Sequence, residues 1–304
     1  GSPLVEKLYT PFQPLAAIET GMLATRLSDA MSILVSMGVP VGQTSRLNRA
    51  VRVLQNVHED GHYPSAESEL IEVGNAIKLA FQLVRTIEAV HDSRPPAIIE
   101  SLRRALKGRL SDTHSTDAHR AQSELYLGLV LAASGMKTGA PRPGSRKSPD
   151  YVVEIDTAAF SVEVKRPGSQ AAIESKIAEA VHQTNEYASH PAVIALDLSD
   201  LWPVSTGVRD VAVTELQNKG VFRAATELAR LQVVRRGSQA GYSRVGVLFC
   251  FAESFLWEAP APHPVPKAAV MMYAEVFPDA YEGLIVEQAR KLRQSLVSGF
   301  EETG

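Results

Sequence analysis

Two acidic residues and a lysine stand where the chain otherwise looks most like a buried hairpin. Residues 148–168 read SPDYVVEIDTAAFSVEVKRPG, and Asp150, Glu163 and Lys165 interrupt the two apolar stretches of this segment. Side chains alternate between the two faces of a strand, so Glu163 and Lys165 share a face. Burial of an acid–lysine pair costs desolvation energy and adds little stability, which favours a chemical role over a structural one.

The register of the hairpin decides whether the third residue lies with the other two. We expect Asp156 to pair with Ala159 across a two-residue turn. This register puts Asp150 opposite Lys165, on the face that Lys165 shares with Glu163. The turn would be Thr-Ala, whereas two-residue turns prefer Asn-Gly or Asp-Gly, and a slip by one residue would move Asp150 to the other face.

Such a face could cut a phosphodiester bond. Two carboxylates a few ångströms apart repel each other unless a cation lies between them. Mg²⁺ prefers oxygen ligands and keeps several waters, and a metal-bound water becomes more acidic. Lys165 would orient the attacking water or stabilise the negative charge that develops on the phosphate. The alternative is a surface hairpin that holds an ordinary salt bridge.

The motif resembles that of the PD-(D/E)xK nuclease superfamily, which includes many restriction enzymes. The matching residues are Pro149-Asp150 and Glu163-Val164-Lys165. The resemblance implies a restriction-endonuclease-like α/β fold, in which a mixed sheet is flanked by helices and the two halves of the motif lie on adjacent strands. Asp150 and Glu163 would ligate Mg²⁺ or Mn²⁺, with the main-chain carbonyl of Val164 as a further ligand. Lys165 would be the catalytic lysine.

The helices on either side of the hairpin supply two more candidates through the same resemblance. Many members of the superfamily have a glutamate on the preceding helix, and Glu124 in AQSELYLGL matches it as a catalytic and metal-binding residue. Some members have a glutamine on the following helix, for which Gln183 in EAVHQTNEY is the catalytic candidate. The resemblance covers about residues 116–200 and says nothing about residues 1–112.

Basic residues flank the motif and would suit a phosphate-rich ligand. Three precede the first acidic residue and one follows the lysine: Arg142, Arg146, Lys147 and Arg166. They could bind the backbone of a nucleic acid through sequence-independent contacts that weaken with salt. The alternative is a solvated loop with ordinary lysine and arginine residues.

The first part of the chain has helical spacing. Apolar residues recur with a helical period over residues 47–57, 70–87 and 98–106. This pattern predicts an all-helical N-terminal domain over residues 1–112, which could recognise a target or a protein partner.

From residue 113 the pattern changes to alternating helices and strands. The expected elements are a helix over 116–135, the hairpin, a helix over 170–188, a strand in PAVIALDLS, a helical region over 208–234 that is either continuous or broken at Gly220, strands in RVGVLFCF and AAVMMYAEVF, and a helix over 281–297. The continuous apolar run in PAVIALDLS fits a strand that is buried on both faces. The alternation predicts an α/β domain with a mixed sheet over residues 113–304.

The composition sets the broad class of the protein. The 304 residues are 45% hydrophobic and include 31 basic and 34 acidic residues, which give a net charge of −3. This balance excludes a polybasic nucleic-acid coat but not a local basic cleft. The single cysteine, Cys250, excludes an intrachain disulfide and a cysteine-based zinc site, and we expect a reduced core thiol. No apolar run approaches the ~20 residues that span a membrane, and the N-terminus lacks a signal-peptide pattern, so we expect a soluble, cytoplasmic protein.

A second motif, HEDGH at residues 58–62, satisfies the zinc-protease pattern H-E-x-x-H. That pattern requires both histidines on one continuous helix. Gly61 precedes the second histidine and Tyr63-Pro64 follow it, so the helix should end near His58. We therefore expect a polar helix end rather than a zinc site.

The sequence thus predicts a Mg²⁺-dependent nuclease, and DNA cleavage by an endonuclease is the leading hypothesis. The alternative from another class is a non-catalytic nucleic-acid-binding or assembly protein that retains the nuclease fold. A single catalytic site per chain would make a homodimer useful for double-strand cuts.

Overall fold

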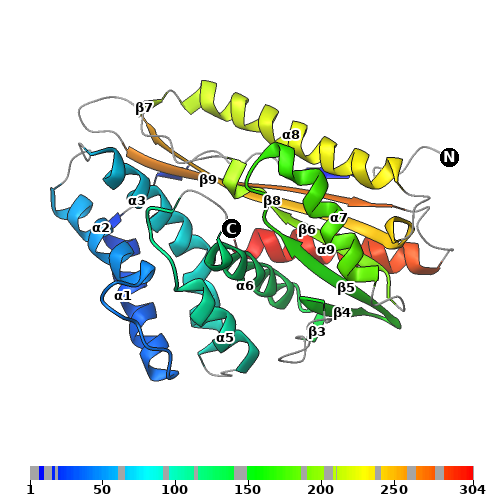
Figure 1. The fold of residues 1–304 in the computed structure, drawn as a ribbon, viewed down its shortest axis with the longest axis horizontal. Helices are drawn as coiled ribbons and strands as arrows, with labels where there is room; N and C mark the ends of the chain where they lie inside the picture. Colours follow the sequence, from blue (N-terminus) through cyan, green and yellow to red (C-terminus); the bar gives the residue numbers. More distant parts are fainter. Residues whose placement is uncertain are drawn as a thin grey trace.

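A mixed sheet organises the chain in the computed structural model (Figure 1). The structure describes residues 7–9, 16–17, 20–60, 66–91, 96–112, 116–139, 149–185, 190–201, 208–209, 211–236, 241–258, 265–277 and 284–303. Within these ranges the sheet has nine strands in the order β1-β9-β8-β6-β5-β4-β3, with β2 also paired to β9 and β7 to β8.

The strands of this sheet differ widely in length. They are β1 (Lys7–Tyr9), β2 (Ala16–Ala17), β3 (Lys137–Gly139), β4 (Tyr151–Ile155), β5 (Ala158–Lys165), β6 (Ala192–Asp197), β7 (Val208–Arg209), β8 (Val245–Glu258) and β9 (Val265–Val276). β5, β6 and β8 run parallel to one another, whereas β3, β4 and β5 form an antiparallel meander and β9 is antiparallel to β8. Parallel neighbours need a crossover connection, which the helices between these strands supply. Every residue of β6 is buried, as predicted for a strand covered on both faces.

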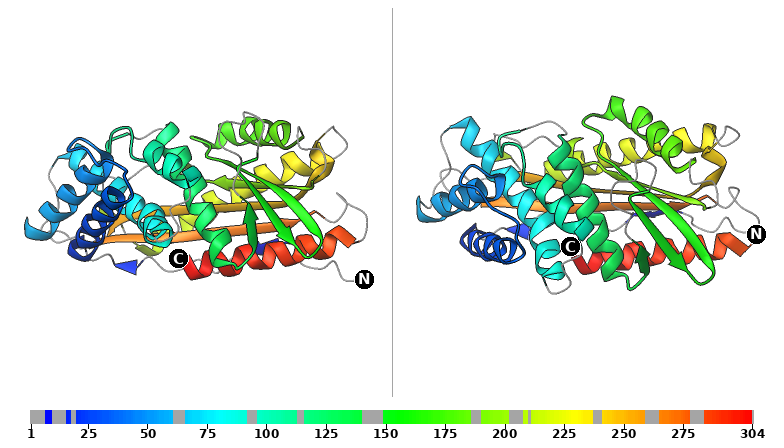
Figure 2. Two further views of the ribbon diagram at one scale, coloured as in Figure 1. Left: turned by 90° about the horizontal axis from the view of Figure 1, so that it is seen from below. Right: turned by 60° about the horizontal axis from the view of Figure 1, so that its bottom comes forward.

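Helices cover both faces of the sheet (Figure 2). They are α6 (Asp117–Ala133), α7 (Ile173–Asn185), α8 (Val211–Arg235) and α9 (Leu284–Thr303). One apolar core lies between the sheet and the α6–α9 pair, and a second lies between the sheet and the α7–α8 pair. Short 3₁₀ turns precede or link these elements: η2 (Gln170–Ala172), η3 (Ser199–Leu201) and η4 (Tyr242–Arg244).

A helical region precedes α6 and packs against it. Its helices are α1 (Thr20–Ser36), α2 (Arg46–Asp60), α3 (Glu67–Leu79), the π-helical turn η1 (Ala80–Val84), α4 (Arg85–Val90) and α5 (Pro96–Ala105). Ala121 and Leu125 of α6 belong to the apolar core of this region, whereas Leu127 and Val130 belong to the core beneath the sheet. The core of the helical region and the core between the sheet and the α6–α9 pair therefore meet on α6.

The helix predicted over residues 116–135 is α6, and local features of the chain fix both of its ends. The side chain of Thr116 accepts a hydrogen bond from the main-chain N–H of His119 at 3.3 Å, which caps the first turn. Gly135 follows the helix with φ of +75°, a conformation that favours glycine.

Two elements differ from the predicted ones. The predicted all-helical N-terminal segment also contains β1 and β2, which pair with β9 from the other end of the chain. The helical region around Gly220 is not broken, since α8 is continuous. An exposed glycine costs a helix about 1 kcal/mol, which the packing of the other residues of α8 outweighs.

The register of the β4–β5 hairpin also differs from the predicted one. Ile155 pairs with Ala158, so the turn consists of Asp156 and Thr157, and Asp156 adopts φ of +52°. Aspartate tolerates this left-handed conformation better than most residues. The shift amounts to two residues, and side chains alternate with a period of two, so the predicted sharing of faces survives.

The described helices include none that is both long enough and apolar enough to cross a membrane. Cys250 lies in β8 as a buried free thiol, as predicted.

Candidate active site

Asp150 immediately precedes β4, and its side chain is tied to the middle of the motif on β5. Its Oδ2 accepts a hydrogen bond of 2.8 Å from the main-chain N–H of Val164, the residue between Glu163 and Lys165. The antiparallel pairing of β4 with β5, which joins Tyr151 to Val162, delivers Asp150 to this position. The two halves of the motif, 13 residues apart in sequence between Asp150 and Glu163, are therefore adjacent in space.

Lys165 lies between two acidic side chains. Its Nζ is 3.2 Å from Oε1 of Glu163 and 3.1 Å from Oε1 of Glu179. Glu179 comes from α7, which crosses the sheet directly after β5, and it also pairs with Lys176 at 2.8 Å. The ammonium group of Lys165 is thus held toward the carboxylates of the motif rather than extended into solvent.

Glu124 belongs to the same electrostatic cluster. One of its carboxylate oxygens lies 3.5 Å from Nη1 of Arg104 in α5. Burial and the negative charge of Asp150 raise the pKa of Glu124 to about 7, against the opposing influence of Arg104 and Lys165. The interaction of Glu124 with both Asp150 and Lys165 shows that α6 delivers this carboxylate near the motif.

A tyrosine fastens the helix of Glu124 to the strand of the motif. The hydroxyl of Tyr151, in β4, donates a hydrogen bond of 2.6 Å to the main-chain carbonyl of Glu124. Gly128, one turn later in α6, makes room for this tyrosine, because a Cβ at that position would lie 2.5 Å from the hydroxyl oxygen. The glycine therefore allows α6 and β4 to approach closely.

Burial and mutual repulsion make the acids of the cluster weak. Burial, followed by the charge of Asp150, raises the pKa of Glu163 to about 8, although Lys165 opposes the shift. Burial also raises the pKa of Asp150, whereas the hydrogen bond from Val164 lowers it. Carboxylates that are buried close together disfavour each other's charged form, and Lys165 offsets only part of this effect.

This donor set suits a hard divalent cation. Asp150 and Glu163 supply carboxylate oxygens, and Mg²⁺ is usually bound by one or two carboxylates while it keeps several waters. Within the described ranges, no group of three or more His, Cys, Asp or Glu side chains is arranged to hold a metal ion. An ion at this site would therefore rely on the Asp150–Glu163 pair, main-chain oxygen such as that of Val164, and water.

Two groups of predicted site residues stand apart from this cluster. Gln183 is exposed near the end of α7, and the α7 side chain that reaches Lys165 is Glu179, one turn earlier. The basic residues of the loop before β4, Arg142, Arg146 and Lys147, lie outside the described residues.

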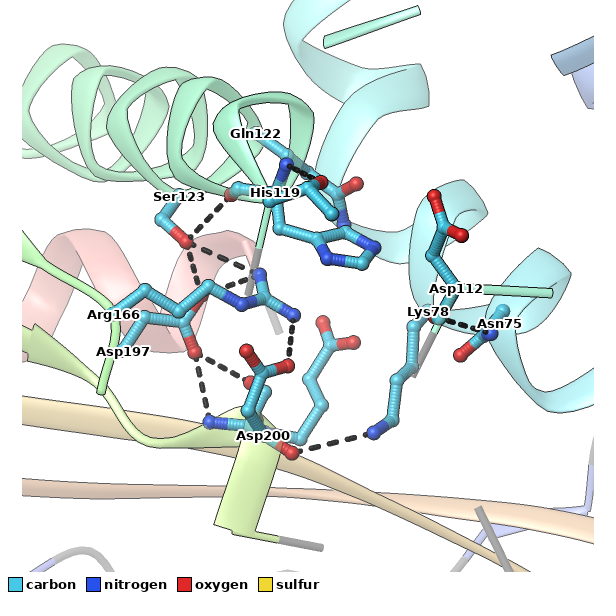
Figure 3. Close-up of polar contacts among 12 residues, drawn as sticks. Asn75, Lys78, Asp112, His119, Gln122, Ser123, Arg166, Asp197 and Asp200 are labelled. Atoms are coloured by element: carbon cyan, nitrogen blue, oxygen red, sulfur yellow. Dashed lines mark hydrogen bonds and ion pairs between the residues drawn. The ribbon is translucent and has the colours of Figure 1, made fainter. Parts of the chain in front are cut away.

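The prediction that Arg166 grips nucleic acid was wrong, because this side chain is only 4% exposed. Its Nη1 lies 3.2 Å from Oδ2 of Asp197, and its Nη2 lies 2.9 Å from Oδ1 of Asp200 (Figure 3). It also donates a hydrogen bond of 3.1 Å to the hydroxyl of Ser123 in α6. A guanidinium enclosed in this way cannot reach a phosphate on the surface.

Neither Glu179 nor the acids around Arg166 were among the predicted site residues. The signal for Asp197 and Asp200 was present, since Asp197 is the last residue of the fully buried parallel strand β6 and Asp200 lies in the turn η3 just after it. Carboxylates in that place need a buried partner, and Arg166, the residue after the neighbouring strand β5, provides it.

The zinc-protease motif finds no support in the described part of the chain. α2 ends at Asp60, close to the predicted end, and Gly61 and His62 lie outside the described residues. The ring of His58 packs against Gly21 of α1, where a Cβ would lie 2.8 Å from Nδ1 of the ring.

Comparisons with known proteins identify no relative of this chain. No protein-family model matches it, and neither a curated protein nor a solved structure is significantly similar to it.

Proposed function

We propose that this protein is a metal-dependent nuclease that hydrolyses phosphodiester bonds of nucleic acid, and specifically a DNA endonuclease. The site would be of the PD-(D/E)xK type on a restriction-endonuclease-like core. The proposal rests on the residues of the site and on the order of the elements around it.

One observation carries the proposal: the carboxylate of Asp150 is hydrogen-bonded at 2.8 Å to the main chain between Glu163 and Lys165. Two acids and a lysine from separate strands thereby share one small site, with the lysine Nζ 3.2 Å from Glu163. A salt bridge alone would need only one acid, so the second carboxylate supports a role in chemistry.

The arrangement of elements adds support. A helix with Glu124, a hairpin that carries the motif, a covering helix and a buried parallel strand follow one another as α6, β4–β5, α7 and β6. This is the order in which the superfamily is expected to place its motif residues, and the two halves of the motif lie on adjacent strands of a mixed sheet.

Each residue has a distinct role in the proposed reaction. Asp150 and Glu163 would hold Mg²⁺ or Mn²⁺ together with the main-chain carbonyl of Val164 and water, and Glu124 of α6 would add a further carboxylate beside this pair rather than a third ligand in the present arrangement. When bound, the ion supplies a more acidic water and a more electrophilic phosphorus. Lys165 would orient the attacking water and stabilise the charge that develops on the phosphate, and Glu179 would hold Lys165 in place.

The decisive experiment is cleavage of a supercoiled plasmid with Mg²⁺ or Mn²⁺, with EDTA as the metal-free control. We expect the wild-type protein to nick or linearise the plasmid. Lys165→Met retains the length of the side chain but removes its charge, and we expect this variant to show neither nicking nor linearisation. Lys291→Met is the matched control, because Lys291 is exposed on α9 and pairs with Asp156 at 2.6 Å, away from the site. Equal cleavage by wild type and Lys165→Met would reject the proposed site.

Absence of cleavage by the wild-type protein would lead to a second set of substrates, single-stranded DNA and RNA. If these also remain intact while the protein binds nucleic acid without a metal requirement, the non-catalytic binding role replaces the nuclease.

A further inference from the structure

A small cavity lies where the helical region meets the end of the sheet, and basic side chains surround it. The polar residues that line it include Arg46, Asn75, Lys78, Arg109, Gln122 and Arg166. They come from α2, α3, the segment after α5, α6 and the residue after β5, so the cavity joins parts of the chain that are distant in sequence. Figure 3 shows side chains from α3, α6 and the end of β5 gathered in this region.

The size of the cavity suits a small ion. The volume open to the centre of an oxygen-sized atom is about 20 Å³, which corresponds to a sphere with a radius of about 1.7 Å. A buried water needs about 10–15 Å³ on this measure. The space therefore exceeds that of one water and is comparable to the four oxygens of a tetrahedral oxyanion around their central atom.

Arg46 lines this cavity and has two donors without an acceptor in the described part of the chain. Its side chain is 3% exposed, and its Nη2 donates a hydrogen bond to Oε1 of Gln122. Its Nε and Nη1 are buried and have no hydrogen-bond partner among the described residues. A buried charged donor without an acceptor is strongly unfavourable, so these two groups call for a ligand that accepts hydrogen bonds.

The charged side chains that line the cavity are all basic, and the acids that act on them, Asp112 on Arg46 and Asp200 and Glu253 on Lys78, are not among the lining residues. Burial and the nearby Arg166 lower the pKa of Arg46 to about 10, and the same two causes lower the pKa of Lys78. Asp197 and Asp200 are already engaged by Arg166 through ion pairs of 3.2 and 2.9 Å. No carboxylate is among the described residues that line the cavity. An anion in this space would relieve the repulsion among the three cations.

We propose that this cavity is a binding site for an oxyanion of the phosphate class. The guanidinium group of Arg46 would donate from Nε and Nη1, Lys78 and Arg166 would add positive charge, and the exposed Arg109 would close the outer side. Guanidinium groups suit this ligand because their donors match the geometry of phosphate oxygens. The ligand would connect α2 and α3 of the helical region to α6 and the end of β5.

This site is separate from the candidate active site, and the proposal does not depend on nuclease activity. Ser123 and Arg166 contact each other on the side of the cavity, whereas their chain neighbours Glu124 and Lys165 belong to the candidate active site. Phosphate binding can therefore be tested in the absence of any divalent metal.

The test is isothermal titration of the full chain with inorganic phosphate, in EDTA and at an ionic strength held constant with chloride. We expect saturable binding of one phosphate per chain and a melting temperature that rises with phosphate concentration. Arg46→Gln should weaken binding about tenfold or more, since it removes hydrogen bonds from a charged donor. Arg109→Gln should weaken binding about threefold or more, and this exposed position poses little risk to folding.

Two controls locate the bound ion. Arg120→Gln replaces an exposed arginine on α6 that does not line the cavity, and it should bind phosphate within about twofold of wild type. Lys165→Met should also bind normally. Loss of binding in Lys165→Met, with normal binding in Arg46→Gln and Arg109→Gln, would assign the phosphate to the other site and overturn the proposal.

The titration can also contradict the oxyanion site directly. Absence of saturable binding, or displacement of phosphate by chloride at equal concentration, would contradict an oxyanion site. A competition with a nucleoside 5′-monophosphate identifies the source of the ligand. If the nucleotide displaces phosphate, the site recognises a phosphate group on a larger molecule, and if it does not, the site recognises the free ion.

Discussion

Lys165 and Arg166 are consecutive in the chain, yet they form ion pairs with different parts of the structure. Lys165 pairs with Glu163 and with Glu179 of α7, whereas Arg166 pairs with Asp197 and Asp200 and donates to Ser123 of α6. One end of β5 thus serves both the candidate active site and the buried cluster beneath the helical region. Changes to the two residues should consequently have different effects, on activity in one case and on stability in the other.

Glu179→Gln should reduce metal-dependent plasmid cleavage about tenfold with little change in melting temperature. The substitution removes the partner that holds Lys165 at 3.1 Å, and misplacement of a catalytic group lowers the rate of the chemical step. The partly exposed ion pair itself adds less than about 1 kcal/mol to stability. We expect the substitution to lower kcat and to leave KM unchanged.

Glu174→Gln is the matched control for that prediction. Glu174 is also an exposed acid of α7, but it pairs with Arg236 at 2.9 Å. Equal cleavage rates for Glu179→Gln and Glu174→Gln would show that Glu179 does not position the lysine.

Glu253 should make the protein less stable as the pH rises from about 5 to 8. Burial, followed by the charge of Asp197, raises the pKa of this β8 residue from 4.5 to about 8 in the folded chain. Over that range the unfolded chain has lost the proton and the folded chain retains it, so each rise in pH favours unfolding. The contribution is about 1.4 kcal/mol per pH unit inside this window.

Glu253→Gln removes this titration, and chemical denaturation at several pH values would measure the difference. The free energy of unfolding of the variant should fall less between pH 5 and 8 than that of wild type, whereas the exposed Glu287→Gln should follow wild type. Parallel curves for wild type and Glu253→Gln would contradict the predicted titration.

Asp197→Asn should destabilise the fold by about 3–5 kcal/mol, because it leaves the buried guanidinium of Arg166 with one fewer negative partner. Asp156→Asn breaks an exposed pair with Lys291 and should change stability by less than about 1 kcal/mol. The comparison needs only thermal or denaturant unfolding, and similar losses in both variants would contradict the difference in burial.

Gly128→Ala should destabilise the fold by about 1–3 kcal/mol, since its Cβ would collide with the hydroxyl of Tyr151 at 2.5 Å. Combination with Tyr151→Phe removes the nearest atom and should recover part of the loss, which a double-mutant cycle would detect. Gly220→Ala in α8 has no atom within 4 Å of the new Cβ and should instead stabilise the helix by up to about 1 kcal/mol. If the effects of Gly128→Ala and Tyr151→Phe are additive in the double-mutant cycle, the Cβ at residue 128 does not contact the hydroxyl of Tyr151.

Local patterns in the sequence predicted most helices and the central hairpin. The stripe of apolar residues predicted α2, α3 and α5, and the helix expected over residues 116–135 corresponds to α6. The pleat of β5 predicted that Glu163 and Lys165 share a face, and this prediction survived the wrong register because the error was two residues. The turn itself consists of Asp156 and Thr157, a pair that is not among the favoured two-residue turns Asn-Gly and Asp-Gly, so the sequence did not indicate it.

Contacts between distant segments were not predictable in the same way. β1 and β2 are too short to show a pattern, and their partner β9 lies more than 240 residues further along the chain. Arg166 looked like part of a basic surface because its partners Asp197 and Asp200 come from a later strand end. Glu179 could not be distinguished from other exposed acids on α7 until the crossing of α7 over β5 was known.

The sharing of α6 between two apolar cores has a consequence for folding. Ala121 and Leu125 on one side of this helix complete the core of the helical region, and Leu127 and Val130 on the other side complete the core beneath the sheet. A fragment that begins at residue 113 would expose the first pair to water and lose the pairing of β1 and β2 with β9. The helical region and the sheet should therefore unfold as one cooperative unit. A change that alters the stability of either part should change amide hydrogen-exchange protection in both parts by the same amount.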